Sequence, residues 1–499
     1  MKEAEILAVQ EKTRVYQNII GEDSVPATTG KTFTVTNPAD TRMELGICQQ
    51  SGEEDVNAAV EAAKKALPSW RETAAPERGV YILRAAAYIE ERSEEYIEQL
   101  IKEVGKSYAD AKAEVVRTIR CMRYLAGEAE RLTGETIPSW DKDIIGYTKR
   151  EPIGVVGVIT PWNVPLAIAA WKIATALTCG CTVVFKPSSQ TPVVSYWLVE
   201  AYQAVGLPGG AVNYVTGPGS KVGNAIANHA DIKAVSFTGS NGVGLAINQL
   251  IAKRGARFQA EMGGKNPFVV LEDADLELAA NHVIAGGFGE SGQRCTATSR
   301  VIVVKSVAEE FIEILTEKVK NLNIGNPLHS ETDMGPVIDK GSMEDILEYI
   351  EIGKKENGVL ITGGEQITEG ENAHGYFVAP TLFRNITPDM TIAQEEIFGP
   401  VISIMEAEDF DQALEWSNRV EYGLSSTIYT NDLELATKFI NNIEAGFTHV
   451  NMPSTYSEPQ FPFGGIKDTG VGGFREVGST AIDFYTEYKT VYMKPHSKK

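Results

Sequence analysis

Residues 154–160 read GVVGVIT and residues 182–188 read TVVFKPS. Each is a short run of small and β-branched residues, which is typical of a strand buried on both faces of a parallel sheet. The residues between them, AIAAWKIATALTCG at 167–180, have the length and composition of a helix and end in a glycine, a common helix stop. Strand, helix and strand in this order predict a parallel pair with a crossover helix.

The same alternation continues as far as Ala260. Further strand-like runs lie at 211–217 (AVNYVTG), 234–239 (AVSFTG) and 256–262 (ARFQAEM), with helical stretches such as 196–210 between them. The region from Gly154 to Ala260 is therefore predicted to be an α/β unit built on a doubly wound parallel sheet.

Ligands of such sheets bind outside the carboxyl ends of the strands, so the loops that follow the strands are expected to line a site. These loops read PWNVP (161–165), KPSSQTP (186–192) and FTGSNGVG (237–244). The glycines of FTGSNGVG would let a phosphate approach a helix N-terminus, although close packing explains such glycines equally well. A second glycine run, GVGGF from Gly470, has no strand before it and is interpreted as a turn without a ligand.

Other segments flank this unit on both sides. Strands are expected at 32–40 and 44–50, and helices from Glu53 to about Gly127. A second α/β unit is expected after Asn266, with helices near 309–322 and 343–356 and strands near 301–304, 379–383, 400–407 and 425–430. The strand-like segment 144–154 is predicted to pair with a last strand at 481–493, which is also expected to contact a neighbouring subunit.

Composition narrows the classes of function. The chain has 499 residues, and 46 Lys and Arg stand against 67 Asp and Glu, a net charge of -21. This charge argues against nucleic acid and anionic membranes as partners. The start of the chain lacks a secretory core and no long apolar run follows, so a cytoplasmic protein is expected. Five scattered cysteines predict neither disulfides nor a metal site.

One cysteine stands apart from the other four. Cys295 lies in FGESGQRCTAT (288–298), where glycines and small polar residues leave the sulfur uncrowded, and Glu261 opens the upstream motif EMGGKNP. A thiolate attacks carbonyls, and a carboxylate in an apolar pocket can take a proton from water. The pair predicts acyl chemistry through a thioester, whereas an isolated cysteine is more often a small core residue.

Two other classes of protein remain in view. A cysteine hydrolase or thioesterase normally needs a histidine base, and the six histidines lie outside both motifs. A non-catalytic nucleotide-binding protein would have no need for Cys295, Glu261 and Asn163 together.

Seven motifs occur in one order along the chain: PWNVP, KPS, FTGS, EMGGKNP, FGESGQRCTA, EEIFGPV (395–401) and PFGGIKDTG (462–470). In this they resemble the NAD(P)-dependent aldehyde dehydrogenase superfamily, from about residue 15 to about residue 495. The resemblance implies an α/β fold with a Rossmann-type cofactor domain (1–128 and 152–260), an α/β catalytic domain (261–460) and a small β oligomerisation arm (129–151 and 478–499). It also implies a homodimer or homotetramer.

The resemblance assigns expected roles residue by residue. Cys295 is the expected nucleophile and Glu261 the base for water, while the Asn163 amide and the Cys295 N–H would form an oxyanion hole. Lys186 would bind the adenosine ribose and Glu396 the nicotinamide ribose. The other expected cofactor-binding residues are Thr160, Pro161, Trp162, Ser188, Ser189, Gly219, Phe237, Thr238, Gly239, Ser240, Met262, Gly263 and Phe398, and Gly244 would let the helix pack closely.

Cofactor choice is predicted from one departure from the family pattern. Members restricted to NAD usually carry a glutamate three positions after the KPS lysine, and here that position is Ser189. Without that carboxylate beside Lys186, a ribose phosphate would be tolerated. NADP is therefore predicted to be accepted alongside NAD, or preferred to it.

The aldehyde itself is predicted from Arg117, which falls on a helix that lines the family's substrate tunnel. An arginine there suggests a substrate with a carboxylate, and the chain looks most similar to 2-oxoglutarate semialdehyde (2,5-dioxopentanoate) dehydrogenases. Succinate semialdehyde and aromatic or aliphatic aldehydes are the alternatives. A base such as Glu261 argues for hydrolysis rather than transfer to coenzyme A. The remaining expected tunnel residues are Val164, Ile168, Trp171, Arg294 and Phe461.

Overall fold

The computed structural model describes residues 13–495 and confirms the α/β fold class. The larger of its two main sheets has eight strands in the order β22-β12-β11-β8-β9-β10-β2-β3. Its five predicted strands are mutually parallel, as expected. They are β8 (Val155–Ile159), β9 (Thr182–Lys186), β10 (Val212–Tyr214), β11 (Ile232–Thr238) and β12 (Arg257–Glu261). β2 (Asn18–Ile20) and β3 (Asp23–Val25) extend one edge.

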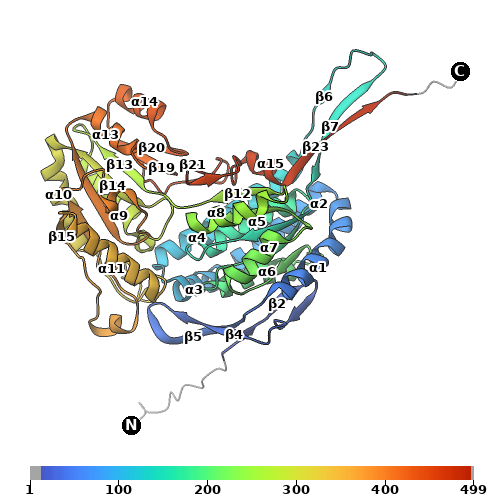
Figure 1. The fold of residues 1–499 in the computed structure, drawn as a ribbon, viewed down its shortest axis with the longest axis horizontal. Helices are drawn as coiled ribbons and strands as arrows, with labels where there is room; N and C mark the ends of the chain where they lie inside the picture. The colour runs from blue at the N-terminus through green and yellow to red at the C-terminus, as the bar shows by residue number, and fades with distance from the viewer. Residues whose placement is uncertain (1–12, 496–499) are drawn as a thin grey trace, which may run out of the picture.

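Helices cover both faces of this sheet (Figure 1), and every residue of its central strands β8 and β9 is accordingly buried. The helix expected at 167–180 is α5 (Pro165–Thr178), in which every residue is buried. The other helices of this lobe are α1 (Glu53–Glu72), α2 (Ala75–Glu91), α3 (Ser93–Val104), α4 (Tyr108–Glu128), α6 (Pro192–Ala204), α7 (Asn224–Asn228) and α8 (Asn241–Ala252). A separate sheet, β1-β5-β4, contains β1 (Val15–Tyr16), β4 (Thr32–Asn37) and β5 (Asp40–Gln49).

The second lobe is the expected second α/β unit, with seven strands in the order β15-β16-β17-β14-β13-β19-β20. Its strands are β13 (Asn266–Val270), β14 (Thr298–Val304), β15 (Val359–Thr362), β16 (Thr381–Arg384), β17 (Val401–Ala407), β19 (Ser425–Tyr429) and β20 (Phe447–Val450). Its helices are α9 (Leu276–Gly287), α10 (Lys305–Lys320), α11 (Lys340–Lys355), α12 (Thr391–Gln394), α13 (Phe410–Asn418) and α14 (Leu433–Asn442). β18 (Tyr422–Gly423) pairs with β21 (Ile466–Lys467).

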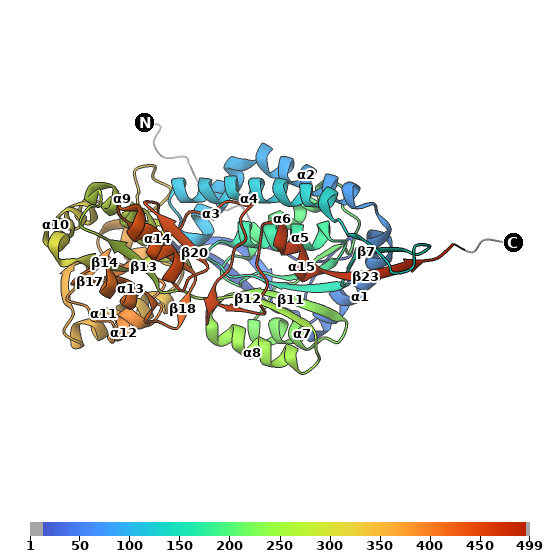
Figure 2. The same cartoon turned by 90° about the horizontal axis from the view of Figure 1, so that it is seen from above.

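A three-stranded arm projects from the larger lobe, away from the smaller lobe (Figures 1 and 2). β23 (Thr486–Met493) pairs antiparallel with β7 (Ile145–Pro152), and β6 (Thr136–Ile137) pairs with the other edge of β7. The predicted pairing of the last strand with the segment near Ile144 is thus confirmed. Tyr488, Tyr492 and Met493 are exposed along β23.

Two details differ from the sequence prediction. Residues 481–485, predicted as part of the last strand, belong to the short helices η5 (Ser479–Ala481) and α15 (Ile482–Tyr485). The reason is burial: Ile482, Phe484 and Tyr485 all pack into the larger lobe, whereas a continuation of the exposed arm strand would turn alternate side chains toward solvent. The run from Gly470, interpreted from the sequence as a turn without a ligand, contains a short strand, β22 (Gly470–Val471), which pairs with β12.

Candidate active site

A cavity of about 730 Å³ lies between the two lobes, where the carboxyl end of the large sheet faces the loop that carries Cys295. Cys295 and Asn163 line it, as do five of the six predicted substrate residues. These five are Arg117, Val164, Ile168, Trp171 and Arg294. Helix α4, the start of α5 and the loop 453–460 supply most of the wall. The structure therefore brings together residues from three distant parts of the chain.

Cys295 is held by its backbone. The Asn266 side-chain amide donates to the carbonyl of Cys295 at 2.8 Å and to the carbonyl of Ala297 at 2.8 Å. A Cβ on Gly264 would lie 2.6 Å from the Cys295 carbonyl oxygen, so the motif needs a glycine there. Burial and the charges of Glu396 and Glu261 raise the pKa of the Cys295 thiol to about 12. Without a further positive charge the sulfur is therefore a thiol at neutral pH.

Asn163 is buried and reaches the same loop. Its side-chain amide donates to the carbonyl of Gln293 at 2.8 Å, two residues before Cys295. A side-chain amide has two N–H donors, so this bond leaves one available to the cavity. The arrangement is compatible with the oxyanion role that the sequence predicts for this residue.

Glu261 lies at the end of β12, buried behind the cavity wall. Its Oε2 accepts a hydrogen bond from the Gly465 N–H at 2.9 Å, and a Cβ on Gly464 would overlap its Oε1. Burial, and next the charge of Glu476, raise its pKa well above the usual value for a carboxyl group. A carboxylate with a raised pKa is a stronger base than an ordinary one, as removal of a proton from water requires.

Sequence reasoning missed a buried polar group beside Glu261. Glu476 accepts a hydrogen bond from the Trp171 indole N–H at 2.7 Å and forms an ion pair with Lys172, whose ammonium also donates to Ser236 at 2.8 Å. The sequence did contain a signal for this group: Lys172 lies in the mostly apolar helix α5, and a buried lysine must find a polar or acidic partner. Trp171, predicted to be either lining or packing, does both.

The predicted cofactor residues gather at the carboxyl ends of β8, β9 and β11. The hydroxyls of Thr160 and Thr238 are buried and make no hydrogen bond within residues 13–495. The Lys186 ammonium is buried and donates to the Pro187 carbonyl at 2.8 Å, and burial lowers its pKa to about 8. Ser189 donates to the Gly217 carbonyl at 3.2 Å. Pro161 and Ser188 are half-buried, and Gly219 is exposed at the start of a short helical turn.

The turn before α8 has the geometry expected for an anion site. Ser240 is the N-cap, and its side chain makes no capping hydrogen bond, so the first N–H groups of this 12-residue helix are available. A Cβ on Gly244 would overlap the Met262 sulfur, which confirms the predicted close packing of the helix. Phe237 and Met262 are buried beneath this turn and support it rather than facing open space.

Glu396 and Phe398 approach from the second lobe. The Gly264 N–H donates to the Glu396 carboxylate at 2.9 Å, and a Cβ on Gly263 would overlap that carboxylate. Burial raises the pKa of Glu396 to about 7. Phe398 adopts a φ of 54°, a left-handed backbone that is unusual for an aromatic residue, and its ring meets Trp162 edge to face with centroids 5.4 Å apart.

Two of the predicted substrate residues differ from the others, Arg294 in the state of its charge and Phe461 in its position. Arg294 lines the cavity, but Asp110 and Glu290 each pair with its guanidinium at 2.8 Å, so its charge is already neutralised. Phe461 is 58% exposed and does not line the cavity, because a turn that begins at Glu458 directs it outward. Phe463 lines the cavity instead and packs against Trp171, with centroids 5.7 Å apart.

Arg117 differs from Arg294 in having no acidic partner. Its guanidinium lies 5.2 Å from the Trp171 ring centroid and 5.9 Å from that of Phe463, and it forms no ion pair within residues 13–495. Stacking holds the planar cation, and no carboxylate pairs with its N–H groups in the described part of the chain. Arg117 is thus a half-buried positive charge on the wall of the cavity that contains Cys295.

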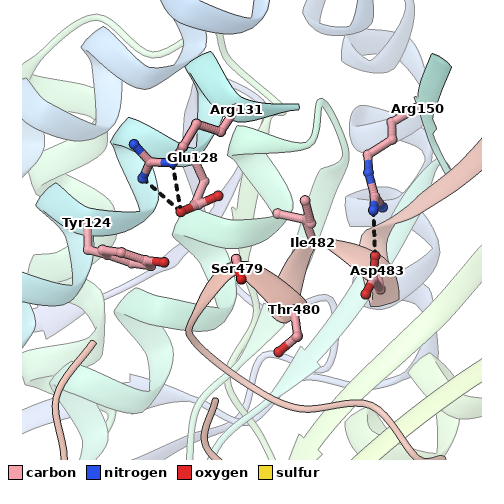
Figure 3. Close-up of a pocket in the computed structure, with 8 residues that line it drawn as sticks. All are labelled: Tyr124, Glu128, Arg131, Arg150, Ser479, Thr480, Ile482 and Asp483. Carbon is pink, nitrogen blue, oxygen red and sulfur yellow. Dashed lines mark hydrogen bonds and ion pairs between the residues drawn. The ribbon is translucent and has the colours of Figure 1, made fainter. Parts of the chain in front are cut away.

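A larger cavity, of about 800 Å³, lies at the base of the arm and lacks such chemistry (Figure 3). Its charged groups pair with one another: Arg131 with Glu128 at 2.7 Å, and Arg150 with Asp483 at 2.8 Å. No cysteine lines it. The second of these pairs joins strand β7 of the arm to helix α15. The candidate site is therefore the cavity with Cys295.

Comparison with known proteins identifies the family. The sequence profile of the aldehyde dehydrogenase family matches residues 25–491. The chain belongs to the aldehyde dehydrogenase family. This aldehyde dehydrogenase is 45% identical to the alpha-ketoglutaric semialdehyde dehydrogenase of Bacillus subtilis, over 98% of this chain and 100% of that protein. It is 42% identical to the 2,5-dioxopentanoate dehydrogenase of Saccharolobus solfataricus, over 93% of this chain and 96% of that protein.

Solved structures agree with this assignment. The NAD+ complex of an aldehyde dehydrogenase from Bacillus cereus superposes with a TM-score of 0.93 at 39% identity, over 96% of this chain and 97% of that chain. The enzyme is thus an NAD(P)-dependent oxidoreductase that acts on aldehydes, not a cysteine hydrolase. Within residues 13–495, no helix is long and apolar enough to cross a membrane, and no group of acidic, histidine and cysteine side chains is arranged to hold a metal.

Proposed function

We propose that this aldehyde dehydrogenase oxidises a semialdehyde with a carboxylate at its far end, with 2-oxoglutarate semialdehyde as the leading candidate. The observation that carries the proposal is Arg117, an unpaired and half-buried arginine on the wall of the cavity that holds Cys295. A buried cation without a partner is costly, and a substrate carboxylate would satisfy it. The names of the two relatives, which act on this semialdehyde, support the same choice.

In this proposal the reaction has two halves. The Cys295 thiol first loses its proton to solvent; the thiolate sulfur then adds to the aldehyde carbon, and the Asn163 amide and the Cys295 N–H bind the resulting oxyanion. The oxyanion collapses with loss of hydride and leaves a thioester on Cys295. Glu261 then removes a proton from water, the water oxygen attacks the thioester, and the acid leaves as the thiol is restored.

The residues at the strand ends fit a nicotinamide dinucleotide. The buried hydroxyls of Thr160 and Thr238 have no hydrogen-bond partner within residues 13–495, and the N-terminus of α8 is uncapped. Lys186 donates only to a backbone carbonyl. These groups can donate hydrogen bonds to a ligand that carries phosphates and riboses. We assign the pyrophosphate to Gly239 and Ser240, the adenosine ribose to Lys186 and the nicotinamide ribose to Glu396. When bound, the oxidised nicotinamide accepts the hydride and adds positive charge near the thiol.

The same proposal assigns a separate role to each of three parts of the chain. The lobe of residues 1–128 and 152–260 would bind the cofactor, residues 261–460 would carry the nucleophile, and the arm of residues 129–151 and 478–499 would join copies of the chain into a homodimer or homotetramer. The exposed edge strand β23 supports the last assignment, since unpaired strand edges bind other strands. Sedimentation of the purified enzyme tests it.

We propose that NADP is accepted alongside NAD, or preferred to it. Ser189 donates to the Gly217 carbonyl and places no carboxylate beside Lys186, so a ribose phosphate meets no repulsion there. Replacing Ser189 with Glu is expected to lower kcat/KM for NADP by about tenfold or more while NAD is affected less. Ser189→Gln, which has similar size and no charge, is the control. A wild-type enzyme that strongly prefers NAD would contradict the prediction.

Replacement of Arg117 with Met tests the substrate class. The variant is expected to raise KM for the semialdehyde by about tenfold to a hundredfold, since a hydrogen bond to a charged group contributes about 1.5–3 kcal/mol. A neutral aldehyde of similar length should show a much smaller change. Steady-state kinetics with both substrates gives the comparison, and equal effects on the two would eliminate Arg117 as a carboxylate ligand.

A further inference from the structure

Helix α4 carries three arginines along the cavity, Arg117, Arg120 and Arg123, at intervals of three residues. Each interval corresponds to about 4.5 Å along the helix axis. Their partners differ. Arg123 forms an ion pair with Glu90, whereas neither Arg117 nor Arg120 forms an ion pair in the part of the chain that the structure describes. The wall therefore carries two free positive charges and one that is neutralised.

The two free arginines lie at different depths. Arg117 is half-buried against Trp171, and its charge lowers the pKa of the Cys295 thiol, so it belongs to the inner part of the cavity. Arg120 is exposed, and its charge acts on Tyr456 in the loop that forms the outer wall. Arg120 is thus at the mouth of the cavity, about one helical turn from Arg117.

The acids around the mouth do not cancel these charges. Glu114 pairs with Lys106 at 2.5 Å, and Glu290 pairs with Lys106 at 3.1 Å and with Arg294 at 2.8 Å. Glu458 lines the outer wall, accepts a hydrogen bond from the neutral Gln460 amide at 2.7 Å and forms no ion pair within residues 13–495. Its single negative charge faces the two free arginines, so the wall keeps a net positive charge. The protein as a whole has a net charge of -21 and repels an anionic substrate. An exposed arginine at the mouth is within a Debye length, about 8 Å, of the approaching carboxylate.

We propose that Arg120 determines specificity by capturing the carboxylate of the incoming semialdehyde at the mouth and delivering it to Arg117. This rests on the proposed function, which supplies the carboxylate. Arg120 acts before the chemical steps, so its contribution belongs to kcat/KM and not to kcat. Because its charge is exposed, its contribution also falls as salt screens it.

The test is kcat/KM of Arg120→Gln for 2-oxoglutarate semialdehyde, measured from about 20 mM to about 500 mM salt. At low salt the variant is expected to lose about threefold to tenfold relative to the wild type, with kcat nearly constant, and the difference should disappear at high salt. Arg120→Lys should restore most of the loss, because capture requires charge rather than a planar group. Arg123→Gln should show a much smaller loss, because Glu90 already neutralises Arg123.

Measurements with a neutral aldehyde distinguish failure of the capture role of Arg120 from failure of the proposed function. If Arg120→Gln lowers kcat/KM equally for the semialdehyde and the neutral aldehyde, or if its deficit persists unchanged at high salt, the capture role is overturned while the proposed function stands. If the wild-type enzyme oxidises only neutral aldehydes, the proposed function fails first, and the capture role falls with it. Thermal unfolding of each variant shows whether helix α4 remains intact.

Discussion

Replacement of Cys295 with alanine is expected to lower kcat by about 10⁴-fold or more, because no other group in the cavity can form the covalent bond to the aldehyde. Hydride cannot leave the aldehyde carbon until that carbon is tetrahedral. Asn163 and the backbone N–H groups can stabilise an oxyanion but cannot create one. The measurement is the absorbance of reduced dinucleotide with semialdehyde in excess.

The controls separate loss of chemistry from loss of structure. The hydrogen bonds that hold this loop are made to the backbone carbonyl of Cys295, so removing the sulfur leaves them in place. The variant should therefore still gain thermal stability when dinucleotide is added. Cys48→Ala is the matched control: Cys48 is fully buried in β5, and its loss should reduce stability by about 1 kcal/mol while kcat is retained. Dinucleotide reduction at the normal rate by Cys295→Ala would refute the covalent mechanism.

Replacement of Glu261 with Gln is expected to stop the second half of the reaction and spare the first. The Gln side chain keeps an oxygen for the Gly465 N–H, so the fold should be preserved. Rapid mixing should show a burst of reduced dinucleotide equal to the enzyme concentration, followed by a steady state slowed by about 10²- to 10⁴-fold. Mass spectrometry of the quenched enzyme should find the acyl group on Cys295.

The pH dependence of the wild type gives a second measurement on the same residue. Burial raises the pKa of Glu261, so its basic form is lost as pH falls through a value above that of an ordinary carboxyl group. Thioester hydrolysis should accordingly decline with falling pH while an exposed carboxylate is still ionised, and Glu261→Gln should lack this limb. Equal loss of the burst and of the steady state in the variant would contradict a role confined to hydrolysis.

Much of the fold follows from local sequence. The strands of the large sheet are continuous apolar runs bounded by glycine and proline, and such runs are stable only when both faces are covered, which requires crossover helices. The catalytic candidates were also recognisable, because Cys295, Glu261 and Asn163 each lie in a short motif whose glycines and polar neighbours have a local purpose. Gly264, for instance, is required by the close approach of the Cys295 carbonyl.

The sequence by itself determined the class of fold, the positions of the five parallel strands of the large sheet and the identity of the candidate nucleophile, base and oxyanion donor, because these depend on short-range patterns. Only the tertiary structure decided which charges are free. Arg294 and Arg117 look alike in the sequence, yet Asp110 and Glu290 neutralise one while the other stacks on Trp171 without a carboxylate. Likewise Phe463 rather than Phe461 faces the cavity, and Glu476 meets Lys172 from the far end of the chain. Pairing and orientation depend on distances between remote segments, and a linear pattern does not contain those distances.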